Sequence, residues 1–317
     1  MKLKDIYELA VKMGIKNDPR DKKVIEERLK DLAKEYKDMS PEKKAAFDKE
    51  RLKNPYGDTR ILYGSPNKKI KKILAGIDVS VGEILLANEL NKGSGKKIDM
   101  VLSHHPDGRG LIGLPAVMDV QVDIFEKHGV PVNVMEKLME ERVGVVSRGI
   151  AGVNHYRDAD AARLLDIAYA CFHTVADNQV HDFLERYFKK EKPKYVGDVI
   201  DSLLKLPEYK EANKMGMGPH IVVGKEKSRA GKVVSVMTGG TSGPKETFMK
   251  LAQAGVGTVV EMHTPEEHLK IARKYHINVV IAGHMASDSL GLNLILDKVE
   301  KKGVEIESCS GFIRVKR

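Results

Sequence analysis

The stretch Lys97-Ile-Asp-Met-Val-Leu-Ser-His-His-Pro106 predicts a buried strand that ends at two adjacent histidines. Met100, Val101 and Leu102 form its apolar run, and Pro106 cannot donate a hydrogen bond to a sheet ladder. A turn just after a strand can bring neighbouring imidazoles to one spot, and two imidazoles at the carboxyl end of a buried strand are a start for a metal site in an α/β sheet. The alternative is that one histidine caps the strand while the other is exposed in the loop.

Length and composition predict a soluble protein with a sizeable core. A chain of 317 residues, 42% of them hydrophobic, favours roughly two domains. No apolar run approaches the ~20 residues of a membrane span, and the N-terminus lacks the apolar core of a secretion signal, so a cytoplasmic location is expected. Cys171 and Cys309 are too few for a disulfide scaffold and are expected to be small hydrophobic residues.

The formal net charge of +9 permits binding to nucleic acids or other anions. However, the lysines are interleaved with glutamates and aspartates, and aromatic residues that could stack on bases make up only 5% of the chain. This pattern is typical of a solvated, ion-paired surface such as thermophilic proteins carry. Neither a nucleic acid nor a membrane is therefore expected as a partner.

The hydrophobic pattern predicts an α/β fold with a helical N-terminal appendage. Apolar residues recur at helical spacing up to about residue 53, and strands alternate with helices from Ile70 onward, which implies parallel βαβ units covered by helices on both faces. The expected organisation is a helical appendage at 1–64, a first part of the α/β core at 65–190, an insertion or connector at 191–230, and a C-terminal part of the core at 231–317.

Local signals also place individual elements. A short strand is predicted at 130–134, and helices are predicted to begin at Asn178 and Leu290. In that interpretation Asp177 caps the first of these helices, and Ser287 or Asp288 caps the second, which is the default role of such residues.

Four of the eleven histidines follow predicted strands: His104, His105, His173 and His284. The carboxyl ends of strands are where α/β sheets bind ligands. The last two of these histidines are each followed, four residues later, by an aspartate, Asp177 or Asp288. Mixed imidazole and carboxylate ligands suit Zn, Mn, Fe or Co better than Mg or Ca, and a carboxylate can bridge two ions ~3.5–4 Å apart.

Other polar residues are predicted at the same edge. Gly239-Gly-Thr-Ser-Gly-Pro244 resembles a phosphate-cradling turn but matches neither nucleotide-binding fingerprint, and the alternative is a flexible turn that needs glycines. Glu261, His263 and His268 surround a predicted strand end and are candidates to bind substrate; alternatively, Glu261 is a solvated rim residue and His268 a surface helix residue. His155 with its two neighbours is a further candidate.

Three motifs occur in a defined order: Ser103-His-His-Pro106, His173-Thr-Val-Ala-Asp177 and Gly283-His-Met-Ala-Ser-Asp288. Together they resemble the NGG-interacting-factor-three family of dinuclear-metal proteins, some of which are described as type 2 GTP cyclohydrolase I homologues. The similarity runs from about Ile70 to the end, without the middle insertion. It implies a two-lobed fold in which N- and C-terminal segments share one lobe, and hexameric rings with the metal sites facing an internal cavity.

The resemblance also implies the metal ligands. Two divalent transition-metal ions (Zn, Mn, Fe or Co) would be held by His104, His105, Asp177, His284 and Asp288. The family usually has Glu where this chain has Asp288, which is one methylene shorter.

These features predict a metal-dependent hydrolase, cyclohydrolase- or phosphohydrolase-like, that acts on a nucleotide or a related small molecule. Glu261 or His263 would be the proton shuttle, since general acid–base catalysis needs a titratable group within one hydrogen bond of the reacting atom. The alternative is a non-catalytic metal-binding or regulatory scaffold whose oligomeric ring engages protein partners. Nucleic-acid binding comes third, supported only by the positive charge.

Overall fold

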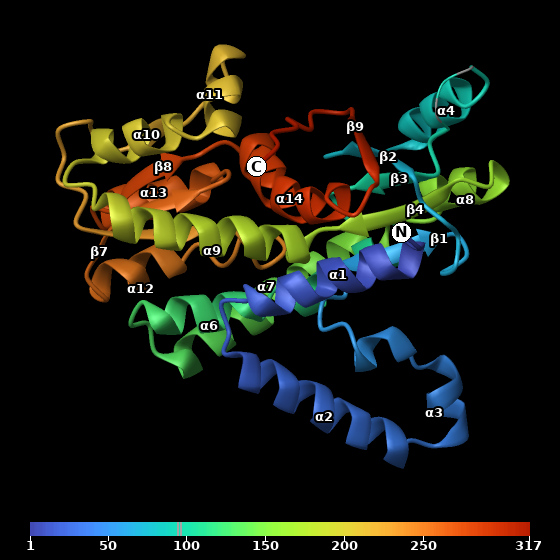
Figure 1. Ribbon diagram of the computed structural model, residues 1–317. Coiled ribbons are helices and arrows are strands. Elements are labelled where there is room, and N and C mark those ends of the chain that lie inside the picture. The colour runs from blue at the N-terminus through green and yellow to red at the C-terminus, as the bar shows by residue number, and fades with distance from the viewer. Residues whose placement is uncertain (94, 96) are drawn as a thin grey trace.

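The computed structural model describes residues 1–93, 95 and 97–317 and contains two sheets flanked by helices (Figure 1). The first sheet has the strand order β1-β4-β3-β2-β9 and the second β5-β8-β7-β6. The strands are β1 (Thr59–Tyr63), β2 (Lys72–Gly76), β3 (Met100–Ser103), β4 (Ala168–Phe172), β5 (His220–Val223), β6 (Lys232–Val236), β7 (Val256–Glu261), β8 (Asn278–Ile281) and β9 (Glu305–Ser308). Each sheet is parallel except for one antiparallel edge strand, β1 or β5. The predicted α/β class with mixed sheets is confirmed.

Helices cover the faces of both sheets. The α-helices are α1 (Leu3–Lys16), α2 (Lys22–Asp38), α3 (Pro41–Ala46), α4 (Val81–Leu90), α5 (Gly108–Gly113), α6 (Val120–Lys127), α7 (Val132–Ala151), α8 (Arg157–Leu164), α9 (Thr174–Glu191), α10 (Val196–Leu204), α11 (Pro207–Lys214), α12 (Thr247–Gln253), α13 (Glu266–Lys274) and α14 (His284–Glu300). Two short 3₁₀ helices, η1 (Lys49–Leu52) and η2 (Leu114–Val117), complete the described elements. None of these helices combines the length and apolar character that crossing a membrane requires.

The two lobes are joined by α9 and α14, which lie along each other (Figure 1). After α14 the chain returns to the first sheet, where β9 pairs in parallel with β2. The packing of the two helices is close, because a Cβ atom at Gly291 would lie 2.3 Å from the carbonyl oxygen of Ala176. This return of the C-terminal segment to the first lobe is the arrangement that the family resemblance implied.

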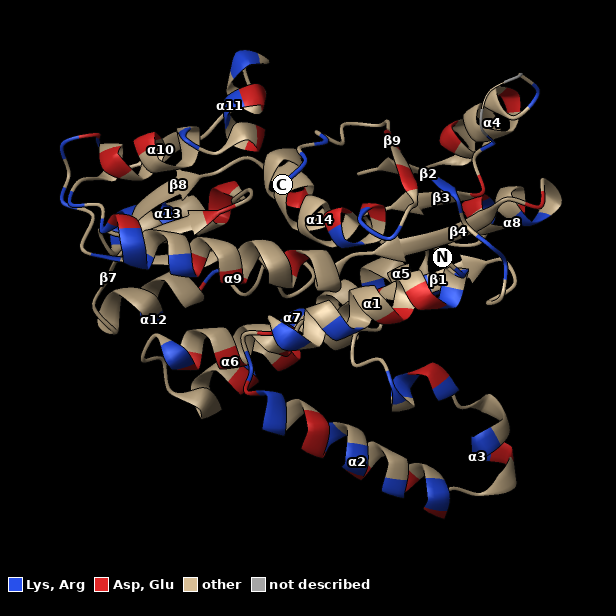
Figure 2. Ribbon diagram, viewed as in Figure 1, with Lys and Arg blue, Asp and Glu red and all other residues tan. Residues whose placement is uncertain are grey.

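The N-terminal helices differ from one another in their role. On α1, Leu3, Ile6 and Ala10 are fully buried in the core of the first lobe, so this helix is part of the fold. By contrast, α2 and α3 extend away from the body of the molecule (Figure 1). Basic and acidic residues are interleaved along α2 (Figure 2), as expected for a solvated helix.

The predicted strand at 130–134 is wrong, because α7 begins at Val132 directly after Pro131. Met135 and Met139 of this helix are buried at helical spacing, so packing of one apolar helix face overrides the β-branched character of the segment. The antiparallel edge strands β1 and β5 were not predicted. The segment 191–230, predicted as a connector, contains α10, α11 and β5.

Two helices begin earlier than predicted, which changes the role of two aspartates. Helix α9 begins at Thr174 and α14 at His284, so Asp177 and Asp288 lie inside the helices and cap neither. Gly283 precedes α14 with a φ of 110°, a left-handed conformation that lets the chain turn directly from β8 into the helix. Because the helices begin early, each histidine and the aspartate four residues after it lie on the same side of the helix start.

Candidate metal centre

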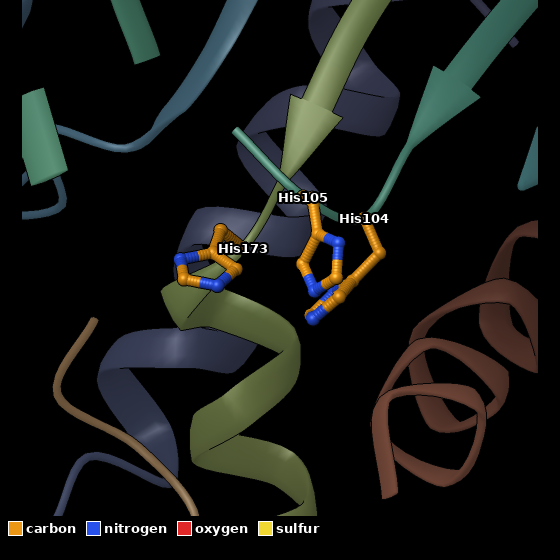
Figure 3. A group of neighbouring side chains, drawn as sticks. All are labelled: His104, His105 and His173. Carbon is orange, nitrogen blue, oxygen red and sulfur yellow. The ribbon is translucent and has the colours of Figure 1, made fainter. Parts of the chain in front are cut away.

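Two neighbouring strands bring three histidines together. Strands β3 and β4 are parallel, with Ser103 opposite Cys171, so their carboxyl ends lie at the same edge of the sheet. His104 and His105 follow β3, and His173 lies between β4 and α9, with the rings close to one another (Figure 3). The ring centroid of His104 is 5.2 Å from that of His105 and 5.1 Å from that of His173. The prediction that the adjacent histidines converge at a strand end agrees with this geometry.

Helices α9 and α14 add two buried carboxylates. His104 Nε2 lies 3.4 Å from Oδ1 of Asp177 and 3.4 Å from Oδ1 of Asp288. The other oxygen of Asp288, Oδ2, lies 3.5 Å from His105 Nε2 and 3.6 Å from His284 Nε2. The carboxylate of Asp288 therefore lies between His104, which faces Oδ1, and the two histidines His105 and His284, which face Oδ2.

Four atoms at this point are buried without a hydrogen-bond partner in the described residues. They are His104 Nε2, Asp177 Oδ1 and both carboxylate oxygens of Asp288. Leaving such groups unpaired is costly, and native proteins rarely do so. Three groups of side chains could each hold an ion with ligand atoms within 4.8 Å of one another: His104, His105 and His173; His105, His284 and Asp288; and His104, Asp177 and Asp288. The residues present therefore fit divalent transition-metal ions.

The opposite ring nitrogens of three histidines are held by the protein. Nδ1 of His105 lies 2.6 Å from Oδ1 of Asp78, and Nδ1 of His173 lies 2.7 Å from Oδ2 of Asp58. Nδ1 of His104 lies 3.1 Å from the carbonyl oxygen of Phe172. Such contacts fix the ring orientation and direct Nε2 toward the centre, as in many metal sites.

Sequence reasoning missed part of this arrangement. Asp58 precedes β1, a strand that was not predicted, and His173 was a strand-end candidate outside the proposed ligand set. Asp78 comes directly after the carboxyl end of β2, and this position could have indicated from the sequence that it faces the same edge of the sheet.

The carboxylates control the electrostatics of the centre. Burial lowers the pKa of His104, but Asp288 and Asp177 outweigh this and hold the pKa well above its ordinary value. Burial raises the pKa of Asp288, yet the surrounding histidines, first among them His104, bring it below its ordinary value. The buried carboxylates thus stabilise positive charge here, whether a proton or a metal ion carries it.

A small pocket of about 80 Å³ adjoins the centre and is lined by Asp177, Asp288 and the 240–244 loop. Gln121 Nε2 holds the loop by donating to the carbonyl oxygens of Gly239, at 2.7 Å, and Thr241, at 2.6 Å. This volume has room for several waters or a phosphoryl group, whereas pockets that enclose whole drug-sized ligands measure roughly 300–1,000 Å³.

The three candidates near β7 all line this pocket. Burial raises the pKa of Glu261 to about 7, and the hydroxyl of Thr264 donates to its Oε2 at 2.6 Å. Burial and the neighbouring His284, whose ring centroid is 4.8 Å away, lower the pKa of His263. His268 is buried, with its ring centroid 5.9 Å from that of Phe248, so its interpretation as a surface residue is wrong.

The candidate at His155 lies elsewhere. It is half-buried in the loop before α8, with its ring centroid 4.5 Å from that of Tyr156, and it belongs to none of the three groups of potential ligands. Cys171 is fully buried, as predicted, and Cys309 is partly buried.

Comparison with protein-family models and with curated proteins finds no match. Among solved structures, a NIF3 superfamily protein from Sphaerobacter thermophilus is 27% identical, with a TM-score of 0.71 over 82% of this chain and 94% of that chain. Reduced HcgD from Methanocaldococcus jannaschii is 18% identical, with a TM-score of 0.46 over 78% of this chain and 87% of that one. A Bacillus cereus protein related to NIF3 is 14% identical, with a TM-score of 0.41 over 81% and 92%.

Of these three similarities, the first alone is strong enough to support a conclusion about this chain. It covers 82% of this chain and 94% of that chain, and its family is the one that the three motifs resemble. The resemblance to the NGG-interacting-factor-three family is therefore confirmed, and the chain has the fold of a NIF3 superfamily protein.

Proposed function

We propose that this protein is a dinuclear-metal-dependent hydrolase that acts on a small phosphate-bearing molecule. The observation that carries the proposal is the set of four unpartnered buried atoms on His104, Asp177 and Asp288. They lie beside a pocket that also contains two titratable groups, Glu261 and His263. A metal site open to a pocket with acid–base groups is the arrangement that metal-assisted hydrolysis requires.

Two of the three ligand groups share Asp288 and no other residue, and the proposal assigns one metal ion to each of them. One would be held by His104, Asp177 and Asp288, and the other by His105, His284 and Asp288. Ions of Zn, Mn, Fe or Co suit these ligands, and a pair of such ions would supply an acidified water and polarise a phosphorus or amidine centre. The shorter side chain at position 288 still reaches both groups, because α14 begins already at His284.

The residues around the pocket supply the remaining steps. With a pKa near neutrality, Glu261 can accept a proton from a water in the pocket and return it to the leaving group. His263, whose pKa is lowered, is neutral at pH 7 and is the second candidate for this role. The 239–244 loop would contact a phosphate, while the rest of a nucleotide would extend out of the small pocket.

Replacing Glu261 with Gln tests the catalytic proposal. The metal content should stay at the wild-type value, whereas turnover should fall by about 10²–10⁴-fold, because the proton acceptor is lost. The measurements are metal ions per chain and the hydrolysis of a panel of nucleoside phosphates by protein loaded with each metal. Glu266→Gln, at an exposed residue that pairs with Arg273, is the matched control and should behave like wild type.

The pH dependence gives a second readout of the same variant. Because Glu261 must be ionised to accept a proton, the wild-type rate should rise with pH, with a midpoint at or below about 7, since nearby cations lower a carboxyl pKa. Glu261→Gln should remove this rise. If metal is present in every variant but no nucleoside phosphate is hydrolysed, the non-catalytic scaffold becomes the better description.

We also propose that the protein is a homo-oligomer, the hexamer implied by the resemblance. Leu85, Leu86 and Leu90 are each nearly half exposed on one side of α4, where contact with a second copy would remove them from water. Leu86→Lys should therefore reduce the mass measured by light scattering. Leu164→Lys on α8 replaces a more exposed leucine outside this surface, and its mass should equal that of wild type.

A further inference from the structure

A second pocket, of about 650 Å³, lies away from the metal centre and shares no lining residue with the first pocket. It is formed by the linker after α1, the end of α6, the second half of α9 and the beginning of β6. Basic segments are visible on α6 and toward the end of α9 (Figure 2). Its volume falls within the roughly 300–1,000 Å³ range of small-molecule sites.

Four lysines line this pocket without a carboxylate partner: Lys127, Lys189, Lys192 and Lys232. In the described part of the chain, none of them lies within 4.0 Å of an acidic oxygen. Lys127 Nζ donates to the carbonyl oxygen of Pro19, and Lys232 Nζ donates to that of His128 at 2.9 Å. These contacts hold two of the ammonium groups in place and leave their charges uncompensated.

The acidic residues of the pocket are already engaged by the protein. Asp182 pairs with Arg186, and Asp18 accepts three hydrogen bonds from Arg20, two of them from the guanidinium. Glu185 Oε1 accepts from the backbone N–H of Ser235, at 3.0 Å, and from its hydroxyl, at 2.8 Å. Glu185 keeps its negative charge, because Ser235 is neutral, but the four unpaired lysines outnumber it and leave the pocket with a net positive character.

His181 adds a buried polar atom that lacks a partner. The side chain is 6% exposed and lines the pocket, and its Nδ1 has no hydrogen-bond partner in the described residues. Burial lowers the pKa of His181 to about 4; Glu185 opposes the shift, while His128 and Lys127 add to it. The imidazole is therefore neutral at pH 7, and its Nδ1 is itself covered from solvent, so a ligand in the pocket would reach it only through a shift of the neighbouring side chains.

We propose that this pocket binds a small molecule that carries a di- or triphosphate group. Four unpaired ammonium groups call for several negative charges close together, and phosphate oxygens accept strong charge-assisted hydrogen bonds from lysine. A single carboxylate would leave most of the positive charge uncompensated. The proposal does not depend on the proposed hydrolase function, because the two pockets have separate lining residues.

The test is calorimetric titration of the full-length protein with inorganic pyrophosphate, tripolyphosphate and ATP. Each titration is carried out on metal-loaded and on chelator-treated protein. We expect saturable binding of one ligand per chain to the chelator-treated protein, with Lys189→Gln and Lys232→Gln each weakening it roughly tenfold through the loss of one charge-assisted contact. The metal-loaded protein should show the same lysine-dependent binding, and any ligand bound at the metal centre should be additional to it and insensitive to these two substitutions. Lys190→Gln, on the same helix but outside the pocket, is the control and should bind like wild type.

Three results would overturn the proposal: no binding of any of the probes, equal weakening by Lys190→Gln and Lys189→Gln, or binding that requires metal and is unaffected by Lys189→Gln. The second result would indicate diffuse attraction to the basic surface, and the third would place the ligand at the metal centre. Absence of hydrolytic activity would contradict the proposed function but leave the outcome of these titrations unchanged.

Discussion

Asp288→Ala is expected to release metal from both proposed positions, lowering the affinity by more than about 100-fold at each. The reason is geometric, because Oδ1 of this carboxylate faces His104 while Oδ2 faces His105 and His284. His284→Ala removes a ligand from only one of the two groups that contain Asp288 and should leave the other ion in place. The measurement is the number of metal ions per chain after reconstitution with Zn, Mn, Fe or Co.

Asp160→Ala serves as the control for this experiment, because it removes an exposed carboxylate that pairs with Arg163 on the surface of α8. Its metal content should equal that of wild type. Metal retained in full by Asp288→Ala, or no metal in the reconstituted wild type, would contradict the dinuclear proposal.

The second large effect is expected from Gly291→Ala, which should lower the free energy of unfolding by about 1–3 kcal/mol. The added Cβ would lie 2.3 Å from the carbonyl oxygen and 2.9 Å from the carbonyl carbon of Ala176, so α9 and α14 would have to separate. The two helices carry Asp177 and Asp288, and metal affinity should therefore fall together with stability. Urea unfolding and metal titration measure the two effects.

Gly149→Ala in α7 is the matched control, because no atom lies within 4 Å of the position that its Cβ would occupy. There the higher helix propensity of alanine should raise stability by up to about 1 kcal/mol. If Gly291→Ala unfolded at the same urea concentration as wild type, the close approach of α9 to α14 would not hold in solution.

Much of the architecture follows from local patterns in the sequence. Helix α4 shows how local such signals are, because Ser80 and Glu83 form a capping box at its start. The parallel strands were recognised as apolar runs between helices. The edge strands β1 and β5 were missed, because such strands are held by pairing with a distant neighbour rather than by a strong pattern of their own.

Local patterns also drew attention to the histidines that gather at the centre. His104, His105 and His284 were identified because they follow predicted apolar strands, at the edge where α/β sheets bind ligands, and the structure brings their rings together. Asp58 could not be identified in this way, because it precedes a strand that was not predicted and meets His173 across 115 residues of sequence. Its contribution depends on long-range packing of the backbone.

The sequence by itself determined the fold class, the family resemblance and most of the side chains that could hold a metal ion, because strand ends and helix spacing are local properties. Only the tertiary structure decided that Asp177 and Asp288 point inward from helix starts instead of capping them, and that His105 and His284 approach across 179 residues. It also decided that four lysines surround a second pocket. Contacts between residues so far apart in the sequence depend on how whole helices and sheets pack, and no pattern within a single segment specifies them.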